Sequence, residues 1–326
     1  MVAQWVLGAP ARLNATNTTK GGPMEADSPF IPKLTTTDWN AEWVELQRAR
    51  RAADSAEHWD ERSKTYKQAD SPTPYVEAFL EYAGVRPGES VLDMGCGTGA
   101  LAIPLGSMGH RVIAADFSRG MLDRVQEDCE RLGLADVSCE LMSWSDDWDA
   151  HGVGPDSVDV ALASRSIATA DLGDSLERLA TVARRRCCLT LPTGSSPRTD
   201  ARILSAIGLQ PFLGRDHLYA FMILSNRGYV PEVRYIASER LDTFASEEAA
   251  WDKLERMVVD ACGTMVGAAE MARALGNLRA WLPDNLVANP EAGRPDGRGG
   301  SQGPLRLREP RVTTWAFIAW DVQRAG

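Results

Sequence analysis

The chain lacks several features that would place it in other protein classes. Its six cysteines are Cys96, Cys129, Cys139, Cys187, Cys188 and Cys262. They form no C-x-x-C pair and no metal-ligand spacing, so we expect neither a disulfide framework nor a metal site. No apolar run is long enough to span a membrane, and residues 1–13 lack the cationic start and the apolar length of a signal peptide. These absences predict a cytoplasmic protein with no membrane partner.

An excess of positive charge is also missing. Lys and Arg number 35 against 45 Asp and Glu, which gives a formal net charge of −10 at pH 7. A single-sign acidic field disfavours nucleic acid as a partner or substrate. The densest cationic run is Arg184-Arg185-Arg186, which we interpret as the solvated end of a helix before a strand rather than as a phosphate site. Residues 1–37 show little periodicity and are expected to form a disordered tail, with Met1 or Met24 as the true start.

The most informative stretch is a strand-like run followed by three alternate glycines. Residues 90–94 are mostly apolar, Gly95, Gly97 and Gly99 follow, and a helical pattern begins near residue 100. Strand, glycine turn and helix form the start of a βα unit that approaches a ligand with its backbone. A dinucleotide site would read G-x-G-x-x-G, whereas here Asp93 stands two residues before the first glycine. A carboxylate at that place would repel a pyrophosphate and suit a cationic amine, which disfavours an NAD-dependent oxidoreductase.

Asp93 to Gly99 closely resembles motif I of the class I S-adenosylmethionine (SAM)-dependent methyltransferases. The resemblance implies that SAM is the cofactor and that Asp93 supports its amino group. It also implies that the turn cradles the methionine part of SAM through Gly95, Cys96, Gly97 and Gly99. Asp116 ends a second predicted strand about 20 residues beyond the turn, where a ribose-binding acid is expected. The following turn into a helix adds Phe117, Ser118 and Met121 to the predicted site.

The adenine side of this predicted pocket departs from the family. The third strand commonly ends there in an Asp that contacts the adenine amino group, but this chain has Ser143, followed by Trp144. The Ser143 hydroxyl could still bond adenine and the Trp144 ring could stack on it. Asp146 and Asp147 follow closely and are alternative sources of the acid.

The resemblance implies an α/β fold with a doubly wound, seven-stranded, mostly parallel sheet and an antiparallel last strand. Strands are expected at residues 90–94, 110–115, 137–142, 156–163, 186–191, 230–237 and 312–322. The expected organisation is a disordered tail (1–37), an N-terminal helical cap (38–74), a SAM-binding core (75–238), a helical insertion with a mobile loop (239–310) and the last strand (311–326). Within the cap, Trp59-Asp60-Glu61-Arg62 and Tyr66 are similar to the lead-in of quinone-type methyltransferases. The insertion is a candidate substrate lid.

The end of the fourth strand should lie beside the transferring methyl group. Ser164-Arg165-Ser166 stands there in place of the Asn- or Asp-Pro-Pro-aromatic motif of nucleic-acid amino methyltransferases, which argues against a nucleobase amino acceptor. Ser164 is therefore placed at the cofactor. Arg165 could bind a carboxylate or phosphate of the substrate, or form an ion pair with a nearby Asp.

Histidines that could serve as a general base are few. The chain has His58, His110, His151 and His217. His217 follows the fifth strand on the ligand edge and is the first candidate, with His58 in the cap second. An ordinary surface or packing role is the more common one for either histidine.

Together these features predict methyl transfer from SAM to an O, N or C nucleophile of a small-molecule acceptor. The alternative is a SAM-binding sensor or inactive partner without methyl transfer. A homodimer is left open.

Overall fold

The computed structural model describes residues 33–49, 56–63, 72–194, 199–210, 214–262, 266–296 and 300–323. By its internal contacts the chain divides into two units, residues 1–37 and Asp38–Gly326. In the first unit the described part holds one short helix, α1 (Lys33–Thr36), and the predicted tail otherwise lies outside the described residues. Among the described helices, none combines the length and apolar character needed to cross a bilayer.

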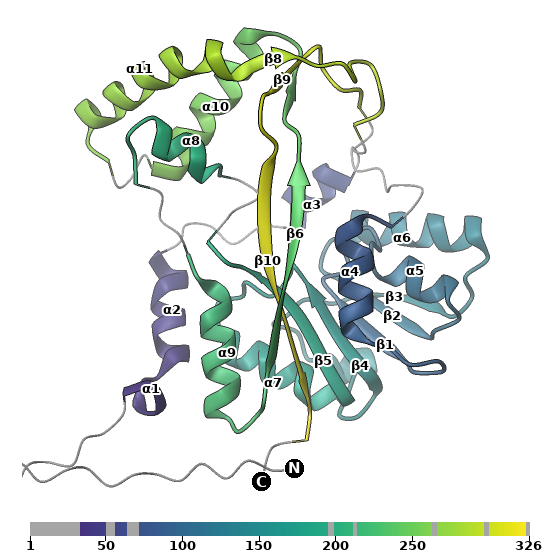
Figure 1. Cartoon of the computed structure of the whole chain (residues 1–326). Coiled ribbons are helices and arrows are strands. Elements are labelled where there is room, and N and C mark those ends of the chain that lie inside the picture. The colour runs from purple at the N-terminus through teal and green to yellow at the C-terminus, as the bar shows by residue number, and fades with distance from the viewer. Residues whose placement is uncertain are drawn as a thin grey trace, which may run out of the picture. The chain divides into compact units, whose positions relative to one another are not determined.

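The second unit is built on a seven-stranded sheet of order β3-β2-β1-β4-β5-β10-β6 (Figure 1). The strands are β1 (Val91–Met94), β2 (Val112–Asp116), β3 (Val137–Leu141), β4 (Val158–Ser164), β5 (Ala183–Pro192), β6 (Glu232–Arg240) and β10 (Arg311–Asp321). Strands β1 to β5 pair in parallel, while β10 lies antiparallel between β5 and β6. The predicted doubly wound α/β sheet with an antiparallel last strand is therefore confirmed.

Helices cover both faces of this sheet because successive strand residues point to opposite sides. On one face Phe317 and Ala319 of β10 belong to a core with α4 (Pro74–Ala83), α5 (Ala102–Ser107) and α6 (Arg119–Leu132). On the other, Ile318 and Trp320 join a core with α2 (Trp39–Ala49), α7 (Leu172–Val182) and α9 (Asp216–Asn226). Two buried layers thus hold the strand ends in place.

The N-terminal helix α2 is tied to the start of α7. Trp43 is fully buried, and its indole Nε1 donates to the carbonyl of Thr169 at 2.9 Å. Asn40 donates to Asp171 Oδ1 at 2.9 Å and accepts from the backbone N–H of Gly173 at 2.7 Å. A second N-terminal helix, α3 (Ala56–Ser63), contacts α6 instead.

Strand β5 begins earlier than its hydrophobic pattern indicates. It starts at Ala183, so Arg184-Arg185-Arg186 lie in the strand, and their interpretation as a helix end is wrong. Each arginine has an acidic partner distant in sequence: Arg184 pairs with Asp159, Arg185 with Glu89, and Arg186 with Glu232 and Asp321. Because these ion pairs balance the charge of the three arginines, the strand can begin at Ala183, before its apolar residues.

Strand β6 also differs from its predicted bounds. Strand β6 begins after Pro231 and continues to Arg240, whereas the predicted range is 230–237. A short helix, α8 (Ala201–Ala206), lies between β5 and α9 in the chain.

The connection between β6 and β10 contains more than helices. It holds α10 (Glu247–Cys262), α11 (Ala268–Asn285) and an unpredicted three-stranded sheet of β7 (Thr243–Phe244), β9 (Leu305–Leu307) and β8 (Leu286–Ala288). Helix α8 contributes Ile203 and Leu204 to the hydrophobic core of this insertion. Long strands β6 and β10 lead from the main sheet to it (Figure 1). Its predicted role as a lid stays a prediction, as does the mobile loop expected within residues 239–310.

Candidate cofactor site

The glycine turn joins β1 to α5 and adopts a conformation that side chains disfavour. Gly95, Gly97 and Gly99 have positive φ angles of 72°, 56° and 83°. The backbone N–H groups of Gly95 and Cys96 both donate to the carbonyl of Ala115 in β2, at 2.7 and 3.0 Å. The turn is thereby fixed against the end of the neighbouring strand.

The three glycines have different surroundings. A Cβ on residue 95 would lie 2.3 Å from Ser166 Cβ, and one on residue 99 would lie 3.0 Å from Ile103. At Gly97, in contrast, a Cβ would meet no atom within 4 Å. Gly95 and Gly99 thus permit close packing, whereas Gly97 faces open space that a ligand can approach.

Cys96 completes the turn as an inert thiol. It is buried, and its Sγ lies 3.5 Å from the carbonyl of Gly97. Burial, followed by the nearby Asp93 carboxylate, raises the pKa of Cys96 well above its usual value. A neutral thiol suits packing rather than nucleophilic chemistry.

Asp116 organises the turn from the end of β2. Its Oδ2 accepts from the N–H of Gly97 and its Oδ1 from the N–H of Ser118, both at 2.9 Å. Burial raises the pKa of Asp116, partly offset by these backbone donors. Each carboxylate oxygen has a second lone pair, so the group can also accept from a ribose.

Asp93, in β1, carries a buried carboxylate group. It is 1% exposed, and its Oδ2 has no hydrogen-bond partner among the described residues. Burial, followed by repulsion from Asp116, raises the pKa of Asp93 to about 7. Either a proton or a cationic ligand relieves the cost of such a buried carboxylate oxygen. The residues present therefore fit the amino group of SAM.

Helix α3 lies against the turn that follows Asp116. Ser118 donates to Asp60 Oδ1 at 2.6 Å, and the N–H of Gly120 donates to the same oxygen at 3.0 Å. Ser118 Oγ also accepts from the N–H of Met121 at 3.2 Å, which caps α6. The sequence does not indicate Asp60 as a site residue, although the segment that contains it resembles the lead-in of quinone-type methyltransferases. Of the other predicted neighbours, Met121 is buried and Phe117 is 36% exposed.

The end of β3 forms a compact polar turn. The N–H of Ser143 donates to Asp146 Oδ2 at 2.8 Å, and this bond lowers the pKa of Asp146. Asp146 thus serves the turn itself. Trp144 contacts Trp148, with ring centroids 5.5 Å apart, and its buried Nε1 finds no acceptor in the described part of the chain.

Comparison with known proteins agrees with this geometry. The family model for a methyltransferase domain matches residues 91–186. Residues 91–186 thus form a methyltransferase domain. An uncharacterized protein of Haemophilus influenzae is 34% identical over 185 residues, covering 56% of this chain and 66% of that protein. A tRNA (guanine(10)-N2)-dimethyltransferase of Methanothermobacter thermautotrophicus is 33% identical over 92 residues, 27% of each chain. The chain thus spans less than two thirds of these two relatives.

Among solved structures, the YcgJ protein of Bacillus subtilis aligns with 77% of this chain and 99% of its own. It is 13% identical, and the TM-score is 0.46.

Ser164 is the last residue of β4, and Arg165 follows it directly. Ser164 Oγ lies 2.8 Å from the hydroxyl of Tyr75, which is also 2.8 Å from Thr190 Oγ1. The Arg165 guanidinium lies 4.3 Å from the centroid of the Tyr75 ring and 5.8 Å from that of Trp315. The expected ion pair of Arg165 with an Asp is not formed among the described residues. Tyr75, Thr190 and Trp315 escaped sequence reasoning because their patterns look like ordinary core.

The histidines lie in different places. His217 begins α9, and its Nδ1 is 3.3 Å from the carbonyl of Pro192 at the end of β5, the predicted edge. Burial lowers the pKa of His217. His110 Nδ1 lies 3.0 Å from the carbonyl of Glu89. The side chain of His58 falls outside the described residues.

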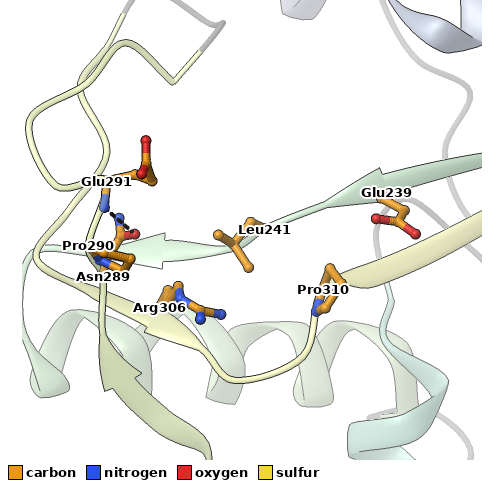
Figure 2. Close-up of a pocket in the computed structure, with 7 residues that line it drawn as sticks. All are labelled: Glu239, Leu241, Asn289, Pro290, Glu291, Arg306 and Pro310. Atoms are coloured by element: carbon orange, nitrogen blue, oxygen red, sulfur yellow. Dashed lines mark hydrogen bonds between the residues drawn. The ribbon is translucent and has the colours of Figure 1, made fainter.

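One open pocket lies outside the methyltransferase domain. Figure 2 shows it in the insertion, at the far end of β6, with a cavity volume of about 510 Å³. Its lining consists of Glu239, Leu241, Asn289, Pro290, Glu291, Arg306 and Pro310. None of the predicted cofactor residues is among them. Within the described ranges, no three His, Cys, Asp or Glu side chains are grouped to hold a metal.

Proposed function

We propose that this protein transfers a methyl group from SAM to a small-molecule acceptor. The observation that carries the proposal is Asp93: a buried carboxylate beside an open glycine turn, with one oxygen that no described residue hydrogen-bonds. The ionised form of such a group is costly unless a cationic ligand completes it. In this proposal Asp93 holds the amino group of SAM, Gly95, Cys96, Gly97 and Gly99 line its methionine part, and Asp116 accepts from its ribose.

The remaining cofactor contacts are proposed by position. Phe117, Ser118 and Met121 form the turn over the ribose, and Ser143 and Trp144 lie at the adenine end. The buried Nε1 of Trp144 donates to no acceptor in the ranges that the structure describes, so adenine is its proposed acceptor. Ser164 bonds Tyr75 and acts by positioning the end of β4.

When bound, SAM supplies an activated methyl group on a sulfonium, so the chain need only align the acceptor and exclude water. His217 is the proposed base for a hydroxyl or acidic-carbon acceptor. Because the carbonyl of Pro192 can only accept, Nδ1 carries the proton and Nε2 keeps a lone pair. Its lowered pKa keeps this ring neutral near pH 7.

A small acceptor is favoured over RNA by charge. The net charge is −10, and the densest cationic run, Arg184 to Arg186, is neutralised by acidic partners. A nucleic-acid substrate requires unpaired cations along its backbone. We further propose a cytoplasmic protein, since all six cysteines are free thiols and five are buried.

The test is methyl transfer from methyl-labelled SAM. Purified protein is incubated with a metabolite fraction below 1 kDa and, separately, with total RNA. We expect label in a small molecule only, and none with Gly97→Ala. Label in RNA would overturn the small-acceptor proposal. SAM binding with no labelled product in either fraction would favour the sensor or inactive-partner alternative.

A further inference from the structure

Arg165 is an exposed cation held in one place by aromatic rings. Its guanidinium carbon lies over the buried Tyr75 ring at 4.3 Å and near the Trp315 ring at 5.8 Å. Stacking of this kind orders a guanidinium while leaving its N–H edge available. No described residue accepts a hydrogen bond from that edge or forms an ion pair with it. The arginine is therefore fixed in place, and the described part of the chain does not neutralise it.

The backbone at Arg165 is also specialised. Its φ angle is 60°, in the left-handed region, which costs conformational energy in a residue other than glycine. The Arg165 N–H donates to Thr190 Oγ1 at 3.0 Å, which holds this conformation from the adjacent strand. The N-terminus of α4 and the end of β5 therefore both help to fix the position of Arg165.

Arg165 stands next to the cofactor turn. The following residue, Ser166, donates from its hydroxyl to the carbonyl of Met94 at 2.6 Å and packs against Gly95. Ser166 is thus in direct contact with the glycine turn. A group bound by Arg165 would lie at the edge of the sheet where the proposed methyl donor binds.

Within the described ranges, the groups that neighbour Arg165 do not supply a balancing charge. Burial raises the pKa of Tyr75, so its phenol stays neutral, and its hydroxyl is already engaged by Ser164 and Thr190. Asp93 is buried beneath the turn and is assigned to the cofactor.

We propose that Arg165 binds a carboxylate of the methyl acceptor, an inference that rests on the proposed function. The planar guanidinium matches a carboxylate through two parallel hydrogen bonds. A single cation balances this monoanion, whereas a phosphate dianion calls for further donors. The acceptor is accordingly a small carboxylic acid.

The experiment measures binding of probe acids by calorimetry, with and without S-adenosylhomocysteine. The probes are benzoate, phenylacetate and hexanoate, with their neutral amides and phenyl phosphate for comparison. The variants are Arg165→Gln and Arg165→Lys. Arg234→Gln is the control, because that guanidinium also stacks on a tyrosine, Tyr82, at 4.9 Å, and its strand β6 lies three strands away from β4 in the sheet.

We expect at least one carboxylate to bind and its affinity to fall at least tenfold in Arg165→Gln. Arg165→Lys should recover part of it, Arg234→Gln should leave it unchanged, and the amides should not bind. Equal affinity in Arg165→Gln, no binding of any carboxylate, or stronger Arg165-dependent binding of phenyl phosphate would overturn the proposal. If the wild type binds a carboxylate through Arg165 but does not bind S-adenosylhomocysteine, that result would instead count against the proposed function.

Discussion

Ser118 and Asp60, 58 residues apart, are joined by a 2.6 Å hydrogen bond from the serine hydroxyl to Oδ1 of the aspartate. The same oxygen accepts from the N–H of Gly120, and Ser63 Oγ donates to the carbonyl of Asp60 at 2.7 Å. Helix α3 is thereby attached to the turn that positions Asp116. This attachment makes an N-terminal helix part of the candidate cofactor site.

Asp60→Ala should weaken both the fold and cofactor binding. It leaves the Gly120 N–H without its acceptor and removes a charged hydrogen-bond partner of Ser118, at a cost of about 1–3 kcal/mol. Urea unfolding would measure the stability loss, and calorimetry with S-adenosylhomocysteine the affinity. Asp60→Asn keeps an acceptor oxygen and should lose less than half as much. Equal losses in both variants would show that charge, not the hydrogen bonds, matters there.

Gly95→Ala should destabilise the protein more than Gly88→Ala. Both glycines have positive φ angles, 72° and 84°, so both substitutions carry the left-handed penalty of about 1–2 kcal/mol. Only at residue 95 does the new Cβ meet Ser166, at 2.3 Å from its Cβ. We expect an additional loss of about 1–3 kcal/mol in denaturant unfolding, from overpacking. Matching stabilities would contradict the close packing of Ser166 on the turn.

The stability of the cofactor-free protein should fall with rising pH because of Asp93. Its pKa is about 7 in the folded protein against 3.8 ordinarily, so the folded state holds the proton more tightly than the unfolded chain. The stabilisation is complete below pH 3.8 and is lost as pH rises toward 7. Relative to Asp93→Asn, which does not titrate, the wild type should lose about 3 kcal/mol more at pH 8 than at pH 5. Denaturant unfolding at the two pH values measures this difference, and a constant gap would contradict it.

Cofactor binding should respond to the same group in the opposite direction. A cationic amino group binds the ionised form of Asp93, so affinity for S-adenosylhomocysteine should rise between pH 6 and pH 8. Calorimetry of wild type and Asp93→Asn across this range measures the effect. The variant should bind more weakly and show no such rise; a rise of equal size in the variant would assign it to another group.

His217 should titrate below its usual pKa of 6.5 with its proton on Nδ1 when neutral. Burial favours the neutral ring, and the Pro192 carbonyl selects the tautomer. Because the folded state binds the second proton more weakly than the unfolded chain, stability should decrease as pH falls below about 6.5. Nitrogen-15 chemical shifts of the histidine rings report both properties. A pKa above 6.5, or a neutral ring protonated on Nε2, would remove His217 as the proposed base.

The glycine turn and its acids could be predicted because their signal is local in sequence. Asp93, Gly95, Gly97, Gly99 and Asp116 lie within 24 residues and at the ends of two adjacent strands. The sheet followed from the same βα pattern, with its antiparallel last strand. These features depend on short-range spacing and on one established topology.

Long-range contacts could not be predicted in this way. The bond of Asp60 to Ser118 and the stacking of Arg165 on Tyr75 join residues 58 and 90 positions apart. The early start of β5 depends on acids elsewhere in the chain that neutralise its arginines. The small sheet of the insertion escaped notice because its strands are two or three residues long.

Calorimetric binding of S-adenosylhomocysteine, SAM and NAD to wild type, Gly97→Ala and Gly133→Ala tests the central claim most directly. Residues 97 and 133 have φ angles of 56° and 69°, and a Cβ at either meets no atom within 4 Å, so both substitutions impose a similar backbone cost. Only residue 97 faces the proposed cofactor. We predict that wild type and Gly133→Ala bind the first two ligands and not NAD, and that Gly97→Ala binds neither. Binding of NAD alone, or unchanged S-adenosylhomocysteine binding in Gly97→Ala, would contradict a SAM site at this turn.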